Sequence, residues 1–387
     1  MVRLSQFSPV ISARLAGSLV LLVLVTHAAR AADGPVAAKE KELIDVLRSG
    51  QPAEKAVACK HLATQGSGAC VPELAKLLAD EQLSSWARIA LEAIPDRAAD
   101  EALRTALGAL QGRLAIGAIN SIAVRRDADA VPLLSGRMQD AQADVASAAA
   151  VALGKIGGAA ATSSLRSALP SAAPPVRNAV AEGCILGAER LLAEGQSAAA
   201  LELYELVRQA DVPKQRKLEA TRGAIFARGQ SGVVLLVEQL RSSDKSFQQL
   251  GLTVARELPG QHVAEALAAE LGHTPPGKAA LLLGALADRP DFQVTADVLK
   301  AAQSGPKELR LAAIAVAGKA GDAATLAPLL EMAADNDADI AQAAQTALAS
   351  LGDERINSEI LARLPSARGT ALRTLIELIG IRRISAT

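Results

Sequence analysis

A repeated segment constrains the fold of this 387-residue chain more than any other feature. The stretch "VALGKIGGAAATSSLRSAL" begins at Val151, and a diverged copy, "VAGKAGDAATLAPLLEM", begins at Val316. Each reads as the end of one helix, a glycine turn and the start of the next helix. Similar links recur along the chain, among them "HLATQGSGACVPELAKLL", "LEAIPDRAADEALRTAL" and "LASLGDERINSEILARL". This pattern predicts stacked helical hairpins, because one hairpin alone cannot bury its apolar face.

Composition and periodicity point to the same architecture. Half of the residues are hydrophobic but only 2% are aromatic, so the core must be mostly aliphatic, and Ala and Leu are strong helix formers. In "DVASAAAVALGKI" the apolar residues recur at helical spacing. At about 32 residues per hairpin, residues 36–382 would hold about eleven hairpins. We therefore predict an all-α fold, a right-handed α-solenoid of about eleven helical hairpins.

The repeats resemble a known family. The segments "AVPLL", "AAAVALGKIGGAAA" and "VAGKAGDAATLAPLL" are similar to bacterial HEAT repeats of the phycobilin-lyase type, and the resemblance extends over nearly the whole chain after its first 31 residues. The stretch "ACKHLATQGS", with the segments that follow it, more narrowly resembles exported HEAT-repeat domain-containing proteins. The resemblance implies an armadillo-like helical solenoid and says little about function. Within residues 195–230, "ALELYELV" looks tetratricopeptide-like.

The chain divides into four predicted segments. Residues 1–31 read as a signal peptide, with Arg3 and Arg14 before an apolar run at 15–25 and an Ala29-Arg30-Ala31 cleavage site. That run is shorter than the roughly 20 residues that span a bilayer, although an uncleaved membrane anchor is the alternative. Residues 32–194 form an N-terminal HEAT-repeat block, 195–230 an irregular TPR-like hairpin, and 231–387 a C-terminal block that ends without a polar cap. We expect an exported protein, periplasmic or extracellular, that is either a fragment or packs its last helix against something outside this sequence.

Charge and cysteine content exclude some classes of protein. The whole chain has 41 basic and 41 acidic residues, and removing residues 1–31 takes away Arg3, Arg14 and Arg30, which leaves 38 against 41, a net charge of −3. A nucleic-acid-binding protein usually has a basic excess. The three cysteines, an odd number, include no C-x-x-C pair. Cys59 and Cys70 either form a disulfide or lie buried, and we expect Cys184 in the core.

The patterns that suggest catalysis or metal binding are incomplete. "GHTPPGKA" fits the core of a phosphate-binding loop but follows a helix and has Ala279 where Ser or Thr would bind magnesium, so we interpret it as an inter-repeat loop. "DNDAD" at 335–339 lacks the Gly and Glu of a calcium loop, and its acids suit a helix N-terminus. Cys59 and His61 are two residues apart and should face different sides of a helix. We expect no enzyme activity, no cofactor and no metal.

A solenoid exposes a long groove that suits extended or large partners. The candidate partner-binding residues are polar or aromatic side chains on the predicted second helices, namely Trp86, Arg88, Arg113, Asn120, Arg125, Arg126 and Lys155. Two alternatives stay open for single residues: Trp86 could fill a gap between hairpins, and Asn120 could belong to a ladder of inter-repeat hydrogen bonds.

Two functions fit these observations. The first is a non-catalytic exported scaffold that binds protein partners, not nucleic acid, through the groove. The alternative is an accessory HEAT segment of a lyase-like or carbohydrate-active enzyme. Its catalytic part would then lie on a missing C-terminal domain or on another, associated subunit.

Overall fold

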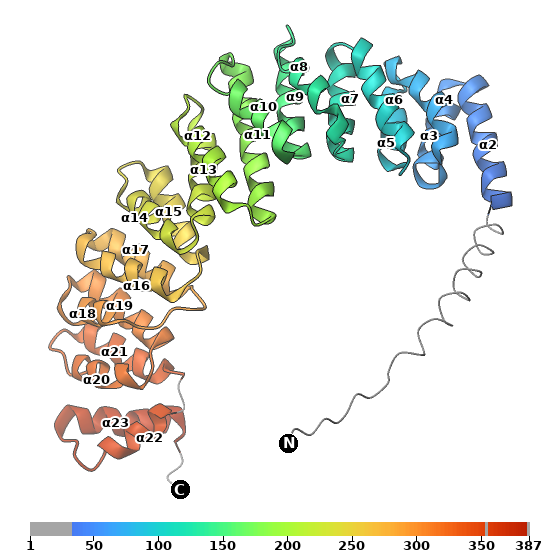
Figure 1. The fold of residues 1–387 in the computed structure, drawn as a ribbon. Coiled ribbons are helices and arrows are strands. Elements are labelled where there is room, and N and C mark those ends of the chain that lie inside the picture. Colours follow the sequence, from blue (N-terminus) through green and yellow to red (C-terminus); the bar gives the residue numbers. More distant parts are fainter. Residues whose placement is uncertain (1–32, 353–354, 385–387) are drawn as a thin grey trace, which may run out of the picture. The chain divides into compact units, whose positions relative to one another are not determined.

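The computed structural model describes residues 33–352 and 355–384, and the predicted signal peptide lies outside these ranges. Every regular element in the described residues is an α-helix or a short 3-10 helix. None of the helices there is long and apolar enough to cross a membrane. The prediction of an all-α solenoid is confirmed (Figure 1).

The α-helices of the described residues pair in chain order into eleven hairpins, as the repeat length predicted. The first helices of the hairpins are α2 (Asp33–Ser49), α4 (Val71–Lys76), α6 (Arg97–Ala109), α8 (Val131–Arg137), α10 (Gly158–Ala168), α12 (Ser197–Gln209), α14 (Val233–Arg241), α16 (Gln261–Ala269), α18 (Ala296–Ser304), α20 (Leu326–Met332) and α22 (Arg355–Arg363). The second helices are α3 (Pro52–Gln65), α5 (Ser84–Ala93), α7 (Gly112–Arg125), α9 (Ala143–Ile156), α11 (Pro174–Ala193), α13 (Lys214–Ala227), α15 (Lys245–Glu257), α17 (Pro276–Ala287), α19 (Lys307–Ala320), α21 (Ala338–Ser350) and α23 (Gly369–Arg382).

The described residues form two compact units, those up to residue 187 and those from residue 188 onward, which we call unit 1 and unit 2. The boundary falls within α11, and the hairpin predicted at 195–230 corresponds to α12 and α13 in unit 2. In each unit the second helices pack against one another in one row, while the first helices form the other row with fewer contacts along it. The second-helix row is therefore the better-packed layer of each unit.

Two glycines explain why the segment that begins at Val151 and its copy that begins at Val316 share part of their sequence. Gly154 of α9 lies so close to α11 that an added Cβ would be 2.4 Å from the carbonyl oxygen of Gly183. Gly318 occupies the matching place in the second copy, where a Cβ would be 2.6 Å from the Cα of Ala347 in α21. Real Cβ contacts are never that short, so both copies need glycine for successive second helices to meet.

The acidic "DNDAD" segment serves helix capping and ion pairing. The Asp337 side chain accepts the backbone N–H of Asp339 at the start of α21, which is the usual task of an N-cap residue. Asp335 accepts a bond from Arg310, and Lys307 pairs with both Asp337 and Asp339. These contacts agree with the helix-terminus interpretation of the acids.

The segment "GHTPPGKA" starts inside the 3-10 turn Glu270–His273 that follows α16 and runs into α17, which begins at Pro276. It therefore joins the two helices of one hairpin, and the interpretation as a loop between repeats was wrong. The link to the preceding repeat is instead the short stretch between Glu257, where α15 ends, and Gln261, where α16 begins.

The three cysteines are unpaired and buried. Burial raises the pKa of the Cys59 thiol to about 11 and those of Cys70 and Cys184 to about 12. His61 is exposed while Cys59 is fully buried, so the two face different sides of α3, as their spacing predicted.

Candidate partner-binding surface

The seven predicted partner-binding residues all lie in or at the end of second helices of unit 1. Trp86 and Arg88 are in α5, Arg113, Asn120 and Arg125 are in α7, Arg126 follows α7, and Lys155 is in the last turn of α9. The structure divides these residues into two groups. One group points between the helices, and the other is exposed to solvent.

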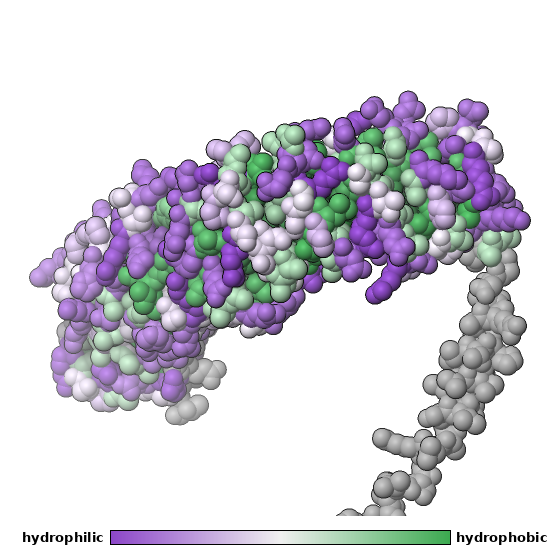
Figure 2. All heavy atoms as spheres, turned by 45° about the horizontal axis from the view of Figure 1, so that its top comes forward, coloured by the Kyte–Doolittle hydropathy of each residue, from purple (hydrophilic) through white to green (hydrophobic). Residues whose placement is uncertain are grey.

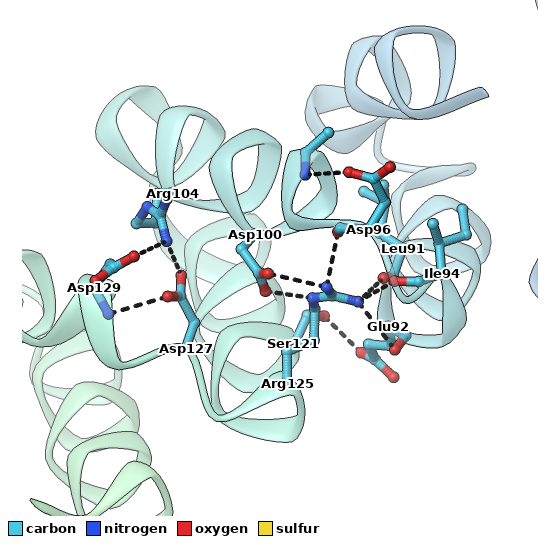
Figure 3. Close-up of polar contacts among 11 residues, drawn as sticks. Leu91, Glu92, Ile94, Asp96, Asp100, Arg104, Ser121, Arg125, Asp127 and Asp129 are labelled. Atoms are coloured by element: carbon cyan, nitrogen blue, oxygen red, sulfur yellow. Dashed lines mark hydrogen bonds and ion pairs between the residues drawn. The ribbon is translucent and has the colours of Figure 1, made fainter. Parts of the chain in front are cut away.

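Arg125 belongs to the first group, with a side chain that is only 9% exposed (Figure 3). Its Nη1 donates to the carbonyl oxygens of Leu91 at 2.7 Å and Ile94 at 2.6 Å, at the end of α5. Its Nε and Nη2 donate to the two carboxylate oxygens of Asp100 at 2.5 and 3.0 Å. The guanidinium thus satisfies carbonyls that a helix end leaves without partners, and its role is structural instead of partner-binding.

Arg88 is half-buried and also contacts the next second helix. Its Nη1 donates to the carbonyl oxygen of Gly117 at 3.2 Å and lies 3.4 Å from the hydroxyl of Ser121. Ser121, which is fully buried, donates to Glu92 at 2.6 Å (Figure 3). The inter-repeat hydrogen bonds considered for Asn120 are therefore made by Arg88 and Ser121.

The arrangement of Arg125 recurs in unit 2, and we call it the arginine clamp. Arg289 donates to the carbonyl oxygens of Ala255 and Leu258 at 2.6 Å each, at the end of α15. Arg382 donates to the carbonyl oxygen of Leu351 at 2.5 Å, after α21. In all three clamps the arginine and the acceptor Ile94, Leu258 or Leu351 are 31 residues apart. This spacing provides a register in which the positions of different repeats can be compared.

The other predicted residues are exposed or partly exposed. Trp86 is 41% exposed, so it does more than fill a gap between hairpins. The side chain of Arg113 is 79% exposed and lies 3.8 Å from the equally exposed Glu81. Asn120, Arg126 and Lys155 are exposed as well, and Arg126 ends α7 in the left-handed conformation, with a φ of 54°.

Sequence reasoning missed the large apolar side chains that accompany Trp86. Val57 in α3, Ile89 in α5 and Val124 in α7 are each at least half exposed. With Trp86 they lie on three consecutive second helices, and we call these four residues the apolar strip. The helical spacing of Trp86, Ile89 and Ala93 could have revealed the strip, since residues three and four apart share a helix face.

A groove adjoins the strip at Val57. It lies between α2 and α3, has a volume of about 840 Å³, and is lined by apolar side chains, including Leu43, Val46 and Ala53, with Glu42 and Glu54 at its edge. On the face drawn in Figure 2, hydrophilic side chains lie between smaller apolar areas. Among the described residues no three His, Cys, Asp or Glu side chains are grouped to hold a metal ion.

Comparison with known proteins identifies the repeat type. Residues 101–184, which run from α6 into α11, match the family model described as HEAT repeats. No curated protein matches the chain significantly.

Several solved structures match the chain over most of its length. An engineered protein has 19% identity and a TM-score of 0.32, with 90% of this chain and 99% of that chain covered. The karyopherin Kap121p bound to the SUMO protease Ulp1p has 11% identity and a TM-score of 0.46, with 89% and 49% covered. Kap95p, solved with RanGDP, has 14% identity and a TM-score of 0.40, with 88% and 50% covered. The chain thus spans about half the length of these karyopherins, and its residues 101–184 match HEAT repeats within an all-α solenoid.

Proposed function

We propose that this protein is a non-catalytic exported scaffold that binds protein partners through the second-helix face of unit 1. The observation that carries the proposal is the apolar strip, which places Val57, Trp86, Ile89 and Val124 in solvent on consecutive helices. Contiguous exposed apolar side chains on a soluble protein mark interaction surfaces. Burying a side chain of this size against a partner contributes about 1.5–3 kcal/mol.

The composition of the surface also suits protein recognition. Trp and Arg are enriched among the residues that contribute most to interfaces, and Trp86 of α5 is exposed, as are Arg113 and Arg126 of the adjacent α7 and its end. Arg88 and Arg125 hold α5 and α7 together beneath this surface. A preorganised surface loses less conformational entropy when a partner binds.

Export and the absence of catalysis are parts of the same proposal. Export rests on the sequence of residues 1–31, which lie outside the described residues. The binding role rests on the apolar strip. The arginines and carboxylates near it bond to one another and to neighbouring helices, so we assign them no catalytic role.

Site-specific photo-crosslinking tests the proposal. A photoreactive amino acid replaces Ile89 on the strip in one variant and the exposed Thr253 of α15 in a matched control, and both are expressed in cells that export the protein. We expect a discrete protein adduct at position 89 and a much weaker one at position 253. Equal adducts at both positions, or an adduct at 253 alone, would contradict the assignment of the surface. Identification of the adduct as an enzyme subunit would support the accessory role instead of an independent scaffold.

A further inference from the structure

One face of α23 in unit 2 and the groove between α2 and α3 in unit 1 are both exposed to solvent. We infer that they bind each other between two copies of this protein. Helix α23 of one copy packs into the α2–α3 groove of a second copy, in the way that one second helix packs on the next. This contact is separate from the proposed function, because its occupant is a second copy and not a different protein.

The buried counterparts of one residue identify the exposed face of α23. The three clamp arginines occupy one place in the repeat, so each residue of α7 corresponds to the residue 164 positions later in α17 and 257 positions later in α23. Ile376 therefore corresponds to Ile119 and Leu283, which are both fully buried in helices that pack on a further second helix, α7 on α9 and α17 on α19. Ile376 itself is 56% exposed. Helix α23 thus exposes an aliphatic side chain at a position that is buried in two other second helices.

Gly380 shows which kind of element fits this face. It lies 62 residues after Gly318, twice the 31-residue spacing of the clamp, and so occupies the same place in the repeat. A Cβ at Gly318 would be 2.6 Å from the Cα of Ala347 in α21, whereas a Cβ at Gly380 would meet nothing within 4 Å. The glycine that lets α19 approach another α-helix is therefore present in α23 with the space beside it open. An α-helix is the element that this face fits.

The charged residues of α23 lie at different positions of the repeat. Glu377 corresponds to Asn120, which is exposed in α7, so Glu377 lies where a packed second helix still faces solvent. Arg373 is exposed but corresponds to Ile116 and Ala280, which are both partly covered. It is three residues from Ile376 and therefore shares its side of the helix. We call Arg373, Ile376 and Gly380 the open face of α23.

The α2–α3 groove is the matching surface. Its volume is about 840 Å³, and its apolar lining includes Leu43 and Val46 of α2 and Ala53 and Val57 of α3. Val57 is 55% exposed, so α5, which also packs on α3, does not cover this side of the helix. A helix that enters the groove therefore extends the row formed by α3, α5 and α7. Exposed apolar surface of this kind marks an interaction site.

The groove is acidic. Glu42, Asp45 and Glu54 line it and are all exposed, and no basic side chain of the described residues belongs to the lining. Asp45 pairs with Arg48 at 3.1 Å, but Arg48 is also held by Glu73 at 3.0 Å, outside the groove. The exposed lysines of α2 and α3 do not line the groove: Lys39, Lys41 and Lys60.

These charges favour a contact between unlike surfaces over one between two α23 helices. If two copies paired through α23, Arg373 of each would meet an open face that contains no acid. The α2–α3 groove instead offers carboxylates to Arg373 and apolar side chains to Ile376. Opposite charges across an interface select the partner and its register. A contact between unlike surfaces can repeat from one copy to the next.

Sedimentation velocity tests the inference with the purified protein and single variants. Ile376→Glu blocks the open face and Val57→Glu blocks the groove, and both side chains are more than half exposed, so the variants should fold, which circular dichroism checks. Leu281→Glu and Val234→Glu are the controls, since these residues of unit 2 are equally or more exposed and lie outside both surfaces. We expect the average mass of the wild type and the controls to rise at least about twofold between about 1 and 100 µM, while both blocked variants stay monomeric.

A mixture of the two blocked variants makes the test specific. Ile376→Glu keeps an intact groove and Val57→Glu keeps an intact α23, so an equimolar mixture should form dimers and nothing larger. A wild type that stays monomeric, or a mixture that does, would overturn the inference. Association of Val57→Glu alone would also overturn it, because α23 would then bind a surface other than the groove. A loss of association in the Leu281→Glu control as large as in Ile376→Glu would contradict the assignment of the open face. The adduct at position 89 is measured separately, so the proposed function stands or fails independently of these results.

Discussion

The two units share the same buried contacts between second helices and differ in the residues that these helices expose to solvent. Arg125 in unit 1 and Arg289 in unit 2 make the same contacts with the end of the preceding second helix, 31 residues earlier. At the exposed positions beside them, Val124 faces solvent in unit 1, while Asp288 in unit 2 pairs with Arg256 at 3.0 Å and Lys319 at 3.2 Å. The repeat therefore dictates the buried positions and leaves the exposed ones free to carry a function.

The two units differ in whether their exposed apolar side chains lie on consecutive second helices. Unit 2 also has large apolar side chains exposed on second helices, Leu281 on α17 and Ile376 and Ile381 on α23. Two intervening second helices, α19 and α21, separate these positions. In unit 1 the apolar side chains occupy three helices in succession, and larger exposed apolar patches mark interaction sites.

The largest expected effect concerns the clamp that the units share. Arg289→Met should lower the free energy of unfolding by about 3–5 kcal/mol, because Asp291 and two helix-end carbonyls lose a partner whose side chain is only 1% exposed. Arg125→Met should cost about 3 kcal/mol for the same reason. Urea unfolding followed by circular dichroism measures both. Arg113→Met, at an exposed position, should change stability by less than about 0.5 kcal/mol, and a clamp variant as mild as this control would show that the clamp is not structural.

The close glycine contacts should have the next largest effect. Gly154→Ala should destabilise unit 1 by about 1–3 kcal/mol, because the new Cβ collides with the backbone of α11, and Gly318→Ala should do the same in unit 2. Gly108 is the matched control, since it is exposed in α6 and an added Cβ there meets nothing within 4 Å. Gly108→Ala should stabilise the helix by about 0.5–1 kcal/mol. A loss of similar size at Gly108 would mean that packing against the next helix is not the cause.

The rate of thiol labelling reports on unit 1 alone, because Cys59, Cys70 and Cys184 all lie in unit 1. Burial raises the pKa of Cys59 to about 11 and that of Cys184 to about 12, so at pH 8 the native thiols should react with Ellman's reagent far more slowly than in denaturant. Arg125→Met should accelerate labelling, and Arg289→Met should do so much less. Rapid labelling of the native protein would contradict the burial of the thiols.

The raised thiol pKa values also predict a pH dependence. A raised folded pKa gives stability that is present below the unfolded value of about 9 and is lost as pH rises toward the folded values. Stability of unit 1 should therefore fall between about pH 9 and pH 11, and replacing all three cysteines by alanine should remove that slope. The Trp86 fluorescence transition reports unit 1 and is the measurement to follow.

The smallest expected effect is that of the surface ion pairs in unit 2. The hydrogen bond from Arg256, and next that from Lys319, lowers the pKa of Asp288. Its contribution is present above the usual range of an aspartate and is lost as pH falls through the lowered pKa. Asp288→Asn should therefore cause a small loss of stability that high salt abolishes, because exposed pairs are screened. A loss that persists in high salt would mean that Asp288 has a role besides these pairs.

The sequence allowed the architecture to be predicted because repeated links and aliphatic periodicity report directly on local helix formation and on burial. The second-helix positions of Trp86, Arg113, Asn120 and Arg126 followed from the same periodicity. The burial of Arg125 did not, since an arginine in the last turn of a helix looks the same in sequence whether it faces solvent or the end of a neighbouring helix. The strip residues Ile89 and Val124 were missed because an apolar side chain in a helix is normally assigned to the core.

The most direct test of the account exchanges the matched surfaces. One variant gives unit 1 the residues of unit 2, Ile89→Thr, Ala93→Glu and Val124→Asp, and its mirror changes Thr253→Ile, Glu257→Ala and Asp288→Val. The measurement is the affinity of each purified variant for the partner identified by crosslinking at position 89. We expect the first variant to lose binding while keeping the unfolding midpoint of the wild type, and the mirror variant to bind as the wild type does. Wild-type binding by the first variant, or loss of binding by the mirror alone, would contradict the claim that the strip of unit 1 is the partner-binding surface.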